Sequence, residues 1–403
     1  MRVYLCTVYV MRAKKYVMYS SAAGIILILT YQFLAWASQG HMQLEKILNF
    51  TKLDDLKGSI DRKSLLTQIP YLHLDIFTRN LTLINITNFQ FIINNDICNI
   101  TTISLVITVH SAPHNIQLRN MIRESWGVPN MLNVETRLVF LLGAPQDEEA
   151  QRHIEAENAD HKDLVQGEFS DTYANLSYKN IMGKLWVSEY CEQAEFVVKT
   201  DDDMFVDLYE VYSITRWYIN TTHYQRNRFL LCPVWRGGLP IMRDPTSKWY
   251  VSFKDIPKDE KAKEGEEFYP TSCAGWLYVT TPGTAMRLAA VAQTARFFWI
   301  DDVWVTGYLA RELGIQHQDL SKYWTMAPGT LLLYKSIQNP IIYHRDFISG
   351  PMDRDKSLSM ALHRRARWCY LNKCFNNIYY QHPPVKIGEM VNSQMITKFF
   401  PGT

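Results

Sequence analysis

An uncharged stretch near the N-terminus indicates how the chain relates to a membrane. Residues 16–37 read YVMYSSAAGIILILTYQFLAWA and contain no Asp, Glu, Lys or Arg. At about 1.5 Å rise per residue, a helix of this length crosses a hydrocarbon core of about 30 Å. The stretch lacks the polar face that a helix on the surface of a soluble protein carries. The pattern predicts an uncleaved transmembrane signal-anchor, with a cleaved signal peptide as the alternative.

The charges around this stretch favour one orientation. Basic residues precede it at Arg12, Lys14 and Lys15, whereas charges of both signs follow it. Because positively charged flanks remain on the cytosolic side, residues 1–15 are expected to form a cytosolic tail. The rest of the chain is then lumenal.

Further along the chain, short β-branched runs alternate with helical patterns. Residues 103–109 (ISLVITV), 138–142 (LVFLL) and 196–198 (FVV) predict buried strands. Residues 115–126 and 147–160 have the spacing of helices. This alternation predicts an α/β domain with a largely parallel sheet flanked by helices, in which a ligand lies beyond the carboxyl ends of the strands.

The part of the chain between the predicted anchor and the first strand carries no catalytic-looking cluster. We interpret residues 38–100 as a lumenal stem and residues 101–403 as the catalytic domain. Asn-X-Ser/Thr sequences, the acceptors of N-glycosylation, all lie after the anchor, as expected for a lumenal protein. They occur at Asn49, Asn80, Asn85, Asn99, Asn175 and Asn220.

Composition excludes some classes of protein. The net charge of +2 lacks the basic excess of a nucleic-acid-coating protein, so no nucleic-acid partner is expected. Six of the seven cysteines follow the anchor, an even number that allows three disulfides in an oxidising compartment. The pairing stays open, and Cys191 and Cys273 could equally be buried thiols.

Three consecutive carboxylates follow the third predicted strand. Asp201, Asp202 and Asp203 lie between the apolar runs 196–198 and 204–206. Adjacent carboxylates repel one another unless a cation or solvent offsets their charge, and hard divalent ions prefer oxygen ligands that bridge to phosphate. The triplet is therefore a candidate site for a metal and a diphosphate, with a solvated acidic turn or helix cap as the alternative.

A second acidic pair begins a helical pattern. Asp301 and Asp302 precede apolar residues with helical spacing, from Val303 to Leu313. One carboxylate can cap the helix while the other acts as a general base toward a substrate.

Six sequence blocks occur in order between about residues 104 and 315. They are Arg119–Trp126 (R-x-x-I-R-x-S-W), Phe140–Gly143 (F-x-x-G), Asp171–Lys179 (D-x-Y-x-N-L-S-x-K), Lys199–Asp203 (K-x-D-D-D), the stretch Lys248–Tyr278 with its K-W and Y-P elements, and Asp301–Val303 (D-D-V). Together they resemble the β-1,3-galactosyltransferase and β-1,3-N-acetylglucosaminyltransferase family of Golgi enzymes.

The resemblance implies a GT-A type fold with a Rossmann-like sheet, an inverting displacement, a Mn²⁺ cofactor and a UDP-sugar donor. It further implies a glycan acceptor on a glycoprotein or glycolipid, and a single-pass type II location in the Golgi membrane. By this resemblance Asp203 binds the metal, Asp201 and Asp202 lie near the metal and the donor ribose, and Asp302 is the base. Donor-side candidates are Arg119, Arg123, Asp171 and Lys179, and His344 is a candidate second metal ligand.

The chain departs from the family pattern at three places. The run Pro270–Cys273 replaces the common aromatic residue of the family's Y-P-x-Y stretch. Asp301 replaces the usual Glu, and the charged span 254–267 is longer than expected. Galactose is the leading donor sugar because Cys273 lies two residues before Gly275. The alternatives are an N-acetylglucosaminyl or N-acetylgalactosaminyl donor, a catalytically inactive glycan-binding relative, and a metal-dependent phosphohydrolase.

Overall fold

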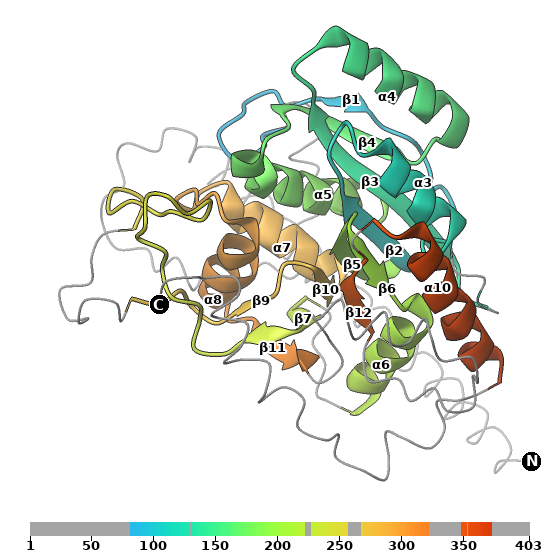
Figure 1. Ribbon diagram of the computed structural model, residues 1–403. Coiled ribbons are helices and arrows are strands. Elements are labelled where there is room, and N and C mark those ends of the chain that lie inside the picture. Colours follow the sequence, from blue (N-terminus) through green and yellow to red (C-terminus); the bar gives the residue numbers. More distant parts are fainter. Residues whose placement is uncertain are drawn as a thin grey trace, which may run out of the picture. The chain divides into compact units, whose positions relative to one another are not determined.

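The computed structural model describes residues 81–128, 131, 133–221, 227–256, 267–321, 348–352 and 354–372 (Figure 1). All of them belong to one unit of the chain, Tyr71–Thr403. Among these residues, no helix combines the length and the apolar character needed to cross a bilayer. The predicted anchor at residues 16–37 and the candidate ligand His344 lie outside the described residues.

An eight-stranded sheet, in the order β1-β4-β3-β2-β5-β10-β7-β11, forms the centre of the described unit. The strands are β1 (Phe91–Ile93), β2 (Ile103–His110), β3 (Thr136–Ala144), β4 (Leu164–Ser170), β5 (Ala194–Asp201), β7 (Phe229–Cys232), β10 (Leu277–Thr280) and β11 (Gln316–Asp319). β4, β3, β2 and β5 are parallel, and β10 is antiparallel to both β5 and β7. β7 therefore points the same way as β5, and β11 is parallel to β7. Only β1 and β10 oppose the others, which confirms the predicted mostly parallel sheet.

Helices flank the sheet, as the alternating pattern predicted. They are α3 (Ile116–Glu124), α4 (Glu148–His161), α5 (Leu176–Tyr190), α6 (Leu208–Thr221), α7 (Pro282–Ala292), α8 (Ala310–Glu312) and α10 (Lys356–Leu371). A short 3-10 helix, η3 (Tyr173–Asn175), precedes α5, and a π-helical segment, η4 (Val303–Leu309), precedes α8. Asp147 caps α4 by accepting a hydrogen bond from the Ala150 amide, so the charged run forms a helix where it was predicted.

Alternate residues of β2 face two different layers. Leu105, Ile107 and Val109 belong to a hydrophobic core that contains residues of α3, α6 and α10. Thr108 and His110 point the other way, toward α5. Helix α5 packs beside α7 (Figure 1). Because the central strands are covered on both faces, their sequences are apolar throughout rather than alternating.

The last part of the predicted stem belongs to this domain. β1 lies within residues 38–100 and pairs with β4, while Leu83 and Phe89 are buried. A disulfide joins Cys98 to Cys191 at the end of α5. The domain therefore begins before residue 101 within the described part of the chain.

Two small sheets complete the described elements. β6 (Met204–Val206) pairs with β12 (Ser349–Pro351), and β8 (Val234–Trp235) pairs with β9 (Ser272–Cys273). A second disulfide joins Cys232 of β7 to Cys273. Cys369 also forms a disulfide, to a partner outside the described residues. Cys191 and Cys273 are thus disulfide-bonded rather than free thiols.

Candidate functional site

The acidic triplet lies at the carboxyl edge of the sheet, where the strand pattern predicted it. β2 and β5 end side by side, with His110 opposite Asp201 in the parallel register. The Asp202 amide donates a hydrogen bond to the His110 carbonyl at 3.0 Å, and Met204 then starts β6. Two buried strands, β5 and β6, therefore hold the turn that presents the three carboxylates.

Asp201 is held by a lysine of its own strand. The Lys199 ammonium donates to Asp201 Oδ1 and to the Gly275 carbonyl, both at 2.6 Å. Burial raises the pKa of Asp201 to about 7, although the Lys199 charge opposes that shift. Asp201 is thus tied through Lys199 to the segment that precedes β10.

Asp202 is fixed by groups from the loop after β2. Its Oδ2 accepts hydrogen bonds from the Ser111 hydroxyl at 2.6 Å and from the Asn115 amide at 2.9 Å. Arg119 donates in turn to the Ser111 oxygen at 2.9 Å. Asp202 is therefore a rigid, buried carboxylate, and its immediate partners Ser111 and Asn115 had no sequence signal beyond their position after a predicted strand.

Asp203 is the exposed member of the triplet. Its backbone carbonyl accepts from the Met352 amide at 2.9 Å, while its side chain bonds to no other described residue. Within the described residues, no group of three or more His, Cys, Asp or Glu side chains could hold a metal. Ions such as Mg²⁺ are commonly bound by one or two carboxylates together with substrate phosphates. An exposed carboxylate beside two fixed ones fits that mode of binding.

The second acidic pair starts the π-helical segment η4. Asp302 caps it by accepting from the Val303 amide at 2.8 Å. A Cβ added at Gly275 would lie 3.1 Å from Asp302 Oδ2, so glycine is what lets the backbone approach this carboxylate. Burial and the charge of Asp301 raise the pKa of Asp302 to about 7. Gly275 thus lies between the two acidic groups: its carbonyl accepts from Lys199, the partner of Asp201, and Asp302 lies close to it.

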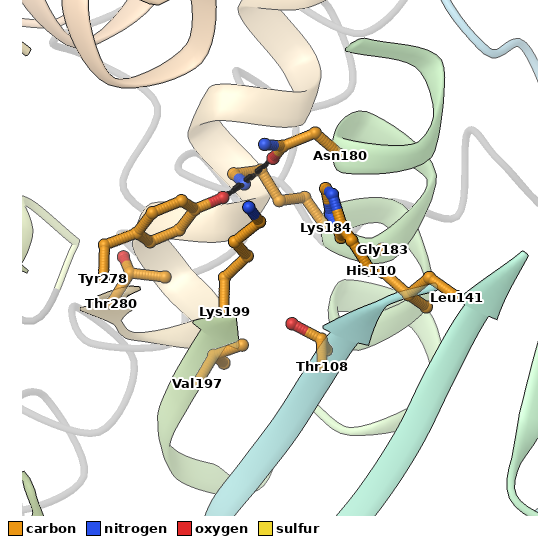
Figure 2. Close-up of a pocket in the computed structure, with 10 residues that line it drawn as sticks. All are labelled: Thr108, His110, Leu141, Asn180, Gly183, Lys184, Val197, Lys199, Tyr278 and Thr280. Atoms are coloured by element: carbon orange, nitrogen blue, oxygen red, sulfur yellow. Dashed lines mark hydrogen bonds between the residues drawn. The ribbon is translucent and has the colours of Figure 1, made fainter. Parts of the chain in front are cut away.

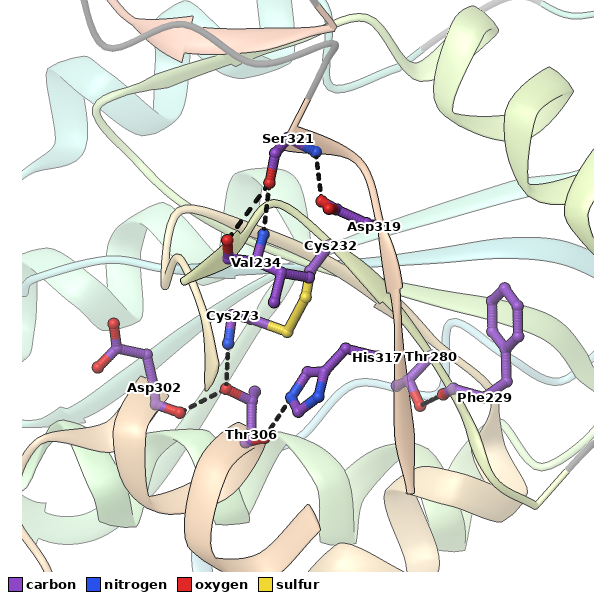
Figure 3. The surroundings of a disulfide bond; sticks show 10 residues. All are labelled: Phe229, Cys232, Val234, Cys273, Thr280, Asp302, Thr306, His317, Asp319 and Ser321. Carbon is purple, nitrogen blue, oxygen red and sulfur yellow. Dashed lines mark hydrogen bonds between the residues drawn. A yellow bond between two sulfur atoms is a disulfide. The ribbon is translucent and has the colours of Figure 1, made fainter. Parts of the chain in front are cut away.

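The backbone of Asp302 is linked to a disulfide (Figure 3). The Thr306 hydroxyl donates to the Asp302 carbonyl at 2.6 Å and accepts from the Cys273 amide at 2.9 Å. Because Cys273 is covalently joined to Cys232, the first turn of η4 is anchored to the core strand β7.

Asp301 points toward α5. Its Oδ2 accepts from the Asn180 amide at 2.7 Å and lies 3.9 Å from His110 Nδ1. Burial and nearby lysines hold the pKa of His110 well below its ordinary value, so the imidazole is neutral. Sequence reasoning missed His110 and Asn180, although His110 ends a predicted strand at the edge where ligands are expected.

Asp171 and Lys179, predicted on the donor side, form an internal ion pair. The Lys179 ammonium lies 2.8 Å from Asp171 and donates to the Ser111 carbonyl at 2.6 Å. Asp171 also accepts from the Gly143 amide at 2.6 Å. The pair therefore joins the ends of β3 and β4 to the loop that fixes Asp202, and its contact with a donor stays a prediction.

Arg119 and Arg123 also have internal partners. The Arg119 side chain is 0% exposed and makes two hydrogen bonds to Glu157, at 2.8 and 2.6 Å. Arg123 bonds to Glu157 and to Asp163. The two guanidinium groups thus join α3 to α4 and to the residue before β4, and their role as donor ligands stays a prediction.

An aromatic surface, Tyr173, Trp249 and Trp299, adjoins the acidic groups. The Tyr173 and Trp299 ring centroids are 6.1 Å apart, and Trp249 Nε1 donates to the Tyr173 hydroxyl at 2.9 Å. Tyr173 is 51% exposed, and Lys248 lies over the Trp249 ring. Burial and the charges of Asp302, Asp301 and Asp201 raise the pKa of Tyr173.

The fold and the site together define an α/β protein with an acidic site at the carboxyl edge of its sheet, the edge where such folds bind nucleotides. Residues 117–321 match the family model described as Galactosyltransferase. That match spans more than half of the chain, and the chain belongs to the galactosyltransferase family.

Two sequence relatives agree with this assignment. Human beta-1,3-galactosyltransferase 5 is 32% identical over 235 residues, covering 58% of this chain and 71% of that protein. Lactosylceramide 1,3-N-acetyl-beta-D-glucosaminyltransferase A of Xenopus laevis is 31% identical over 277 residues, covering 66% of this chain and 68% of that protein. The solved galactosyltransferase LgtC, with donor and acceptor sugar analogues, gives a TM-score of 0.32 at 12% identity and covers 68% of this chain and 98% of that one.

Proposed function

We propose that this protein is an inverting β-1,3-glycosyltransferase that moves galactose from UDP-galactose onto a glycan, with a GT-A type catalytic domain. Membership of the galactosyltransferase family and relatives named for 1,3 transfer support this proposal. The observation that carries it is the position of Gly275 between two acidic groups: its carbonyl accepts from Lys199, which holds Asp201 of the triplet, and Asp302 lies close beside it.

The triplet is assigned to the donor. Asp203 would hold Mn²⁺ together with the diphosphate, and the ion would neutralise the charge that develops on the leaving UDP. Asp201 and Asp202 already have fixed partners in Lys199, Ser111 and Asn115, so they present a rigid edge to the ribose and the metal. His344 remains a candidate second ligand and lies outside the described residues.

Asp302 is assigned the role of general base. It takes the proton of the acceptor hydroxyl as that oxygen bonds to the anomeric carbon, while the bond from that carbon to the UDP oxygen breaks on the opposite face. A pKa of about 7 suits this role, since a base works best when its pKa lies near the working pH. The cap to Val303 and the contact with Gly275 hold the carboxylate in place.

The N-terminal sequence supports a type II Golgi membrane protein with a lumenal catalytic domain. Residues 16–37 are uncharged and follow basic residues, and the disulfides Cys98–Cys191 and Cys232–Cys273 agree with an oxidising compartment.

The donor assignment is tested with the full-length protein in detergent, supplied with Mn²⁺ and one glycan acceptor. We expect galactose transfer to exceed N-acetylglucosamine or N-acetylgalactosamine transfer by about tenfold or more, because a donor pocket discriminates between substituents by that order. The measurement is product formation from each of the three UDP-sugars. Preference for an N-acetylhexosamine would favour the alternative donor, and no transfer from any of the three would contradict the proposed function.

The base assignment predicts a specific pH dependence. Asp302 acts when ionised, so the rate should fall as pH drops through about 7. Asp301→Asn removes the neighbouring negative charge that raises the pKa of Asp302. The acidic limb of the pH profile should therefore lie about one pH unit lower in this variant. The measurement is kcat/KM for the acceptor as a function of pH. Asp160→Asn, an exposed change on α4, is the control and should keep the parent profile. An acidic limb at the same pH in Asp301→Asn as in the parent would contradict the assignment of Asp302 as the base.

The aromatic surface is assigned to the acceptor glycan, because the apolar faces of sugar rings stack on aromatic side chains. Replacing Tyr173 or Trp249 by Ala should raise the acceptor KM about fivefold to tenfold, with the donor KM unchanged. Steady-state kinetics with each substrate varied in turn measures both constants. Trp217→Ala is the matched control, since Trp217 is 42% exposed on α6, which packs on the other face of the sheet from α5. An equal rise in the donor KM would place the aromatic surface on the donor side.

A further inference from the structure

Three polar side chains are buried together along one pocket (Figure 2). Asn180 and Lys184 lie one turn apart on α5, and Tyr278 comes from β10. The Lys184 ammonium donates to the Tyr278 hydroxyl at 2.6 Å and to Asn180 Oδ1. The Tyr278 hydroxyl donates to the same Oδ1 at 2.8 Å. These groups, here termed the buried trio, lie on two elements that the sequence separates widely.

The buried trio fixes the orientation of the Asn180 amide. A lysine ammonium is donor-only, so the amide oxygen of Asn180 must face it. The Asn180 nitrogen then points away from Lys184 and donates to Asp301 Oδ2 at 2.7 Å. Asp301 is therefore bonded to an amide that cannot rotate without breaking two other hydrogen bonds.

Burying the Lys184 ammonium in this position costs free energy, because the charged group loses its contact with water. It is 5% exposed, and within the described part of the chain its ammonium bonds to the neutral groups of Asn180 and Tyr278 rather than to a carboxylate. Burial and the charge of Lys199 lower the pKa of Lys184 to about 7, so the ammonium is most fully charged below neutral pH. An apolar side chain of similar length would avoid this cost, which points to a role beyond packing.

We propose that Lys184, Asn180 and Tyr278 are positioning residues that fix Asp301 and, through the shared start of η4, the neighbouring Asp302. This inference rests on the function proposed above, in which Asp302 is the base. The buried trio acts on Asp301 indirectly. Its atoms face the pocket between α5 and the sheet, and its contact with Asp301 is the hydrogen bond from the Asn180 amide. It thereby couples the packing of α5 against β10 to the placement of the carboxylate pair.

Asp301 and Asp302 also lie in an electrostatic field that charged and titratable groups from several elements produce. Removing the Lys184 cation leaves the Asp302 carboxylate less stabilised as an anion, which disfavours its ionised form. The titratable and charged groups that face the pair are His110 of β2, Lys199 and Asp201 of β5, Lys184 of α5, Tyr278 of β10, Tyr173 of η3, and Tyr269.

Two variants separate position from charge. Lys184→Met keeps the length of the side chain but removes the cation, so kcat should fall about tenfold or more and the acidic limb of the pH profile should move upward. Tyr278→Phe removes two hydrogen bonds, from Lys184 and to Asn180, without changing charge, so kcat should fall while the acidic limb stays in place. The acceptor KM should change little in both variants, because neither residue belongs to the aromatic surface.

Ile181→Val on α5 is the matched control. Ile181 is 0% exposed and outside the buried trio, so its variant should be somewhat less stable than the parent yet keep the parent kcat and pH profile. If Lys184→Met and Tyr278→Phe behave like Ile181→Val, the buried trio is only structural and the inference is wrong, while the proposed function stands.

Crystal structures of the parent and of Lys184→Met at one pH test the inference independently of activity. We expect the Asn180 amide to rotate and the Asp301 side chain to leave its place in the variant. An unchanged Asp301 would overturn the inference even if the parent transferred no sugar, and that lack of transfer would count separately against the proposed function.

Discussion

Asp302→Asn should lower kcat for sugar transfer by about a thousandfold, because general-base catalysis contributes roughly 10² to 10⁴ in rate. Asn keeps the size of the side chain and is itself a favoured helix cap, so it can still accept from the Val303 amide that Asp302 now caps. The carboxylate, which takes the acceptor proton, is the only group lost. The measurement is single-turnover transfer with saturating donor.

The fold and the donor site of Asp302→Asn should be preserved. UDP affinity, measured by calorimetry with Mn²⁺ present, should match that of the parent because Asp302 is assigned to the acceptor side. Asp160→Asn serves again as the exposed control and should transfer normally. Full transfer by Asp302→Asn would refute the assigned base, whereas a loss of UDP binding would move Asp302 to the donor side.

Arg119→Leu should lower the free energy of unfolding by about 3 kcal/mol. Arg119 is fully buried, and its two hydrogen bonds to Glu157 would be lost together with its bond to the Ser111 oxygen. The cost lies at the low end for a broken buried pair because Arg123 still contacts Glu157 at 2.8 Å. Chemical denaturation followed by circular dichroism measures the change.

A paired comparison separates this structural role from the predicted donor contact. Arg152→Leu removes an exposed pair with Glu148, at 3.9 Å, and should change stability by no more than about 0.5 kcal/mol. We expect Arg119→Leu to weaken UDP binding only modestly, through the Ser111 contact with Asp202. A variant as stable as the parent that no longer binds UDP would show that Arg119 is a donor ligand and that the structural account is wrong.

The strand and helix pattern could be predicted because it follows from local sequence. The run 103–109 is β-branched and apolar throughout, and a strand covered on both faces needs that composition. The charged run after Asp147 became α4 because Asp147 can cap it. The antiparallel strand β10, inserted between β5 and β7, could not be predicted in this way, since strand order depends on long-range pairing.

The properties of the acidic triplet depend on residues that are distant in the sequence. Its position at the carboxyl edge follows from the buried strand before it, which the sequence indicates. The different states of its members do not follow from sequence. Asp202 is fixed by Ser111 and Asn115, about ninety residues earlier, whereas Asp203 is exposed. Three consecutive aspartates thus differ in their hydrogen bonds and exposure, because folding brings different partners close to each of them.

By itself, the sequence determined the periodic features of this protein: the uncharged stretch at residues 16–37, the buried strands, the strand-end carboxylates and the helix that Asp302 starts. Each of these depends on neighbours along the chain. Only the tertiary structure decided which cysteines pair, which partners hold Arg119, and how Asn180 reaches Asp301 across 121 residues. Such contacts depend on the packing of whole elements against the sheet, and no local pattern of residue types encodes that packing.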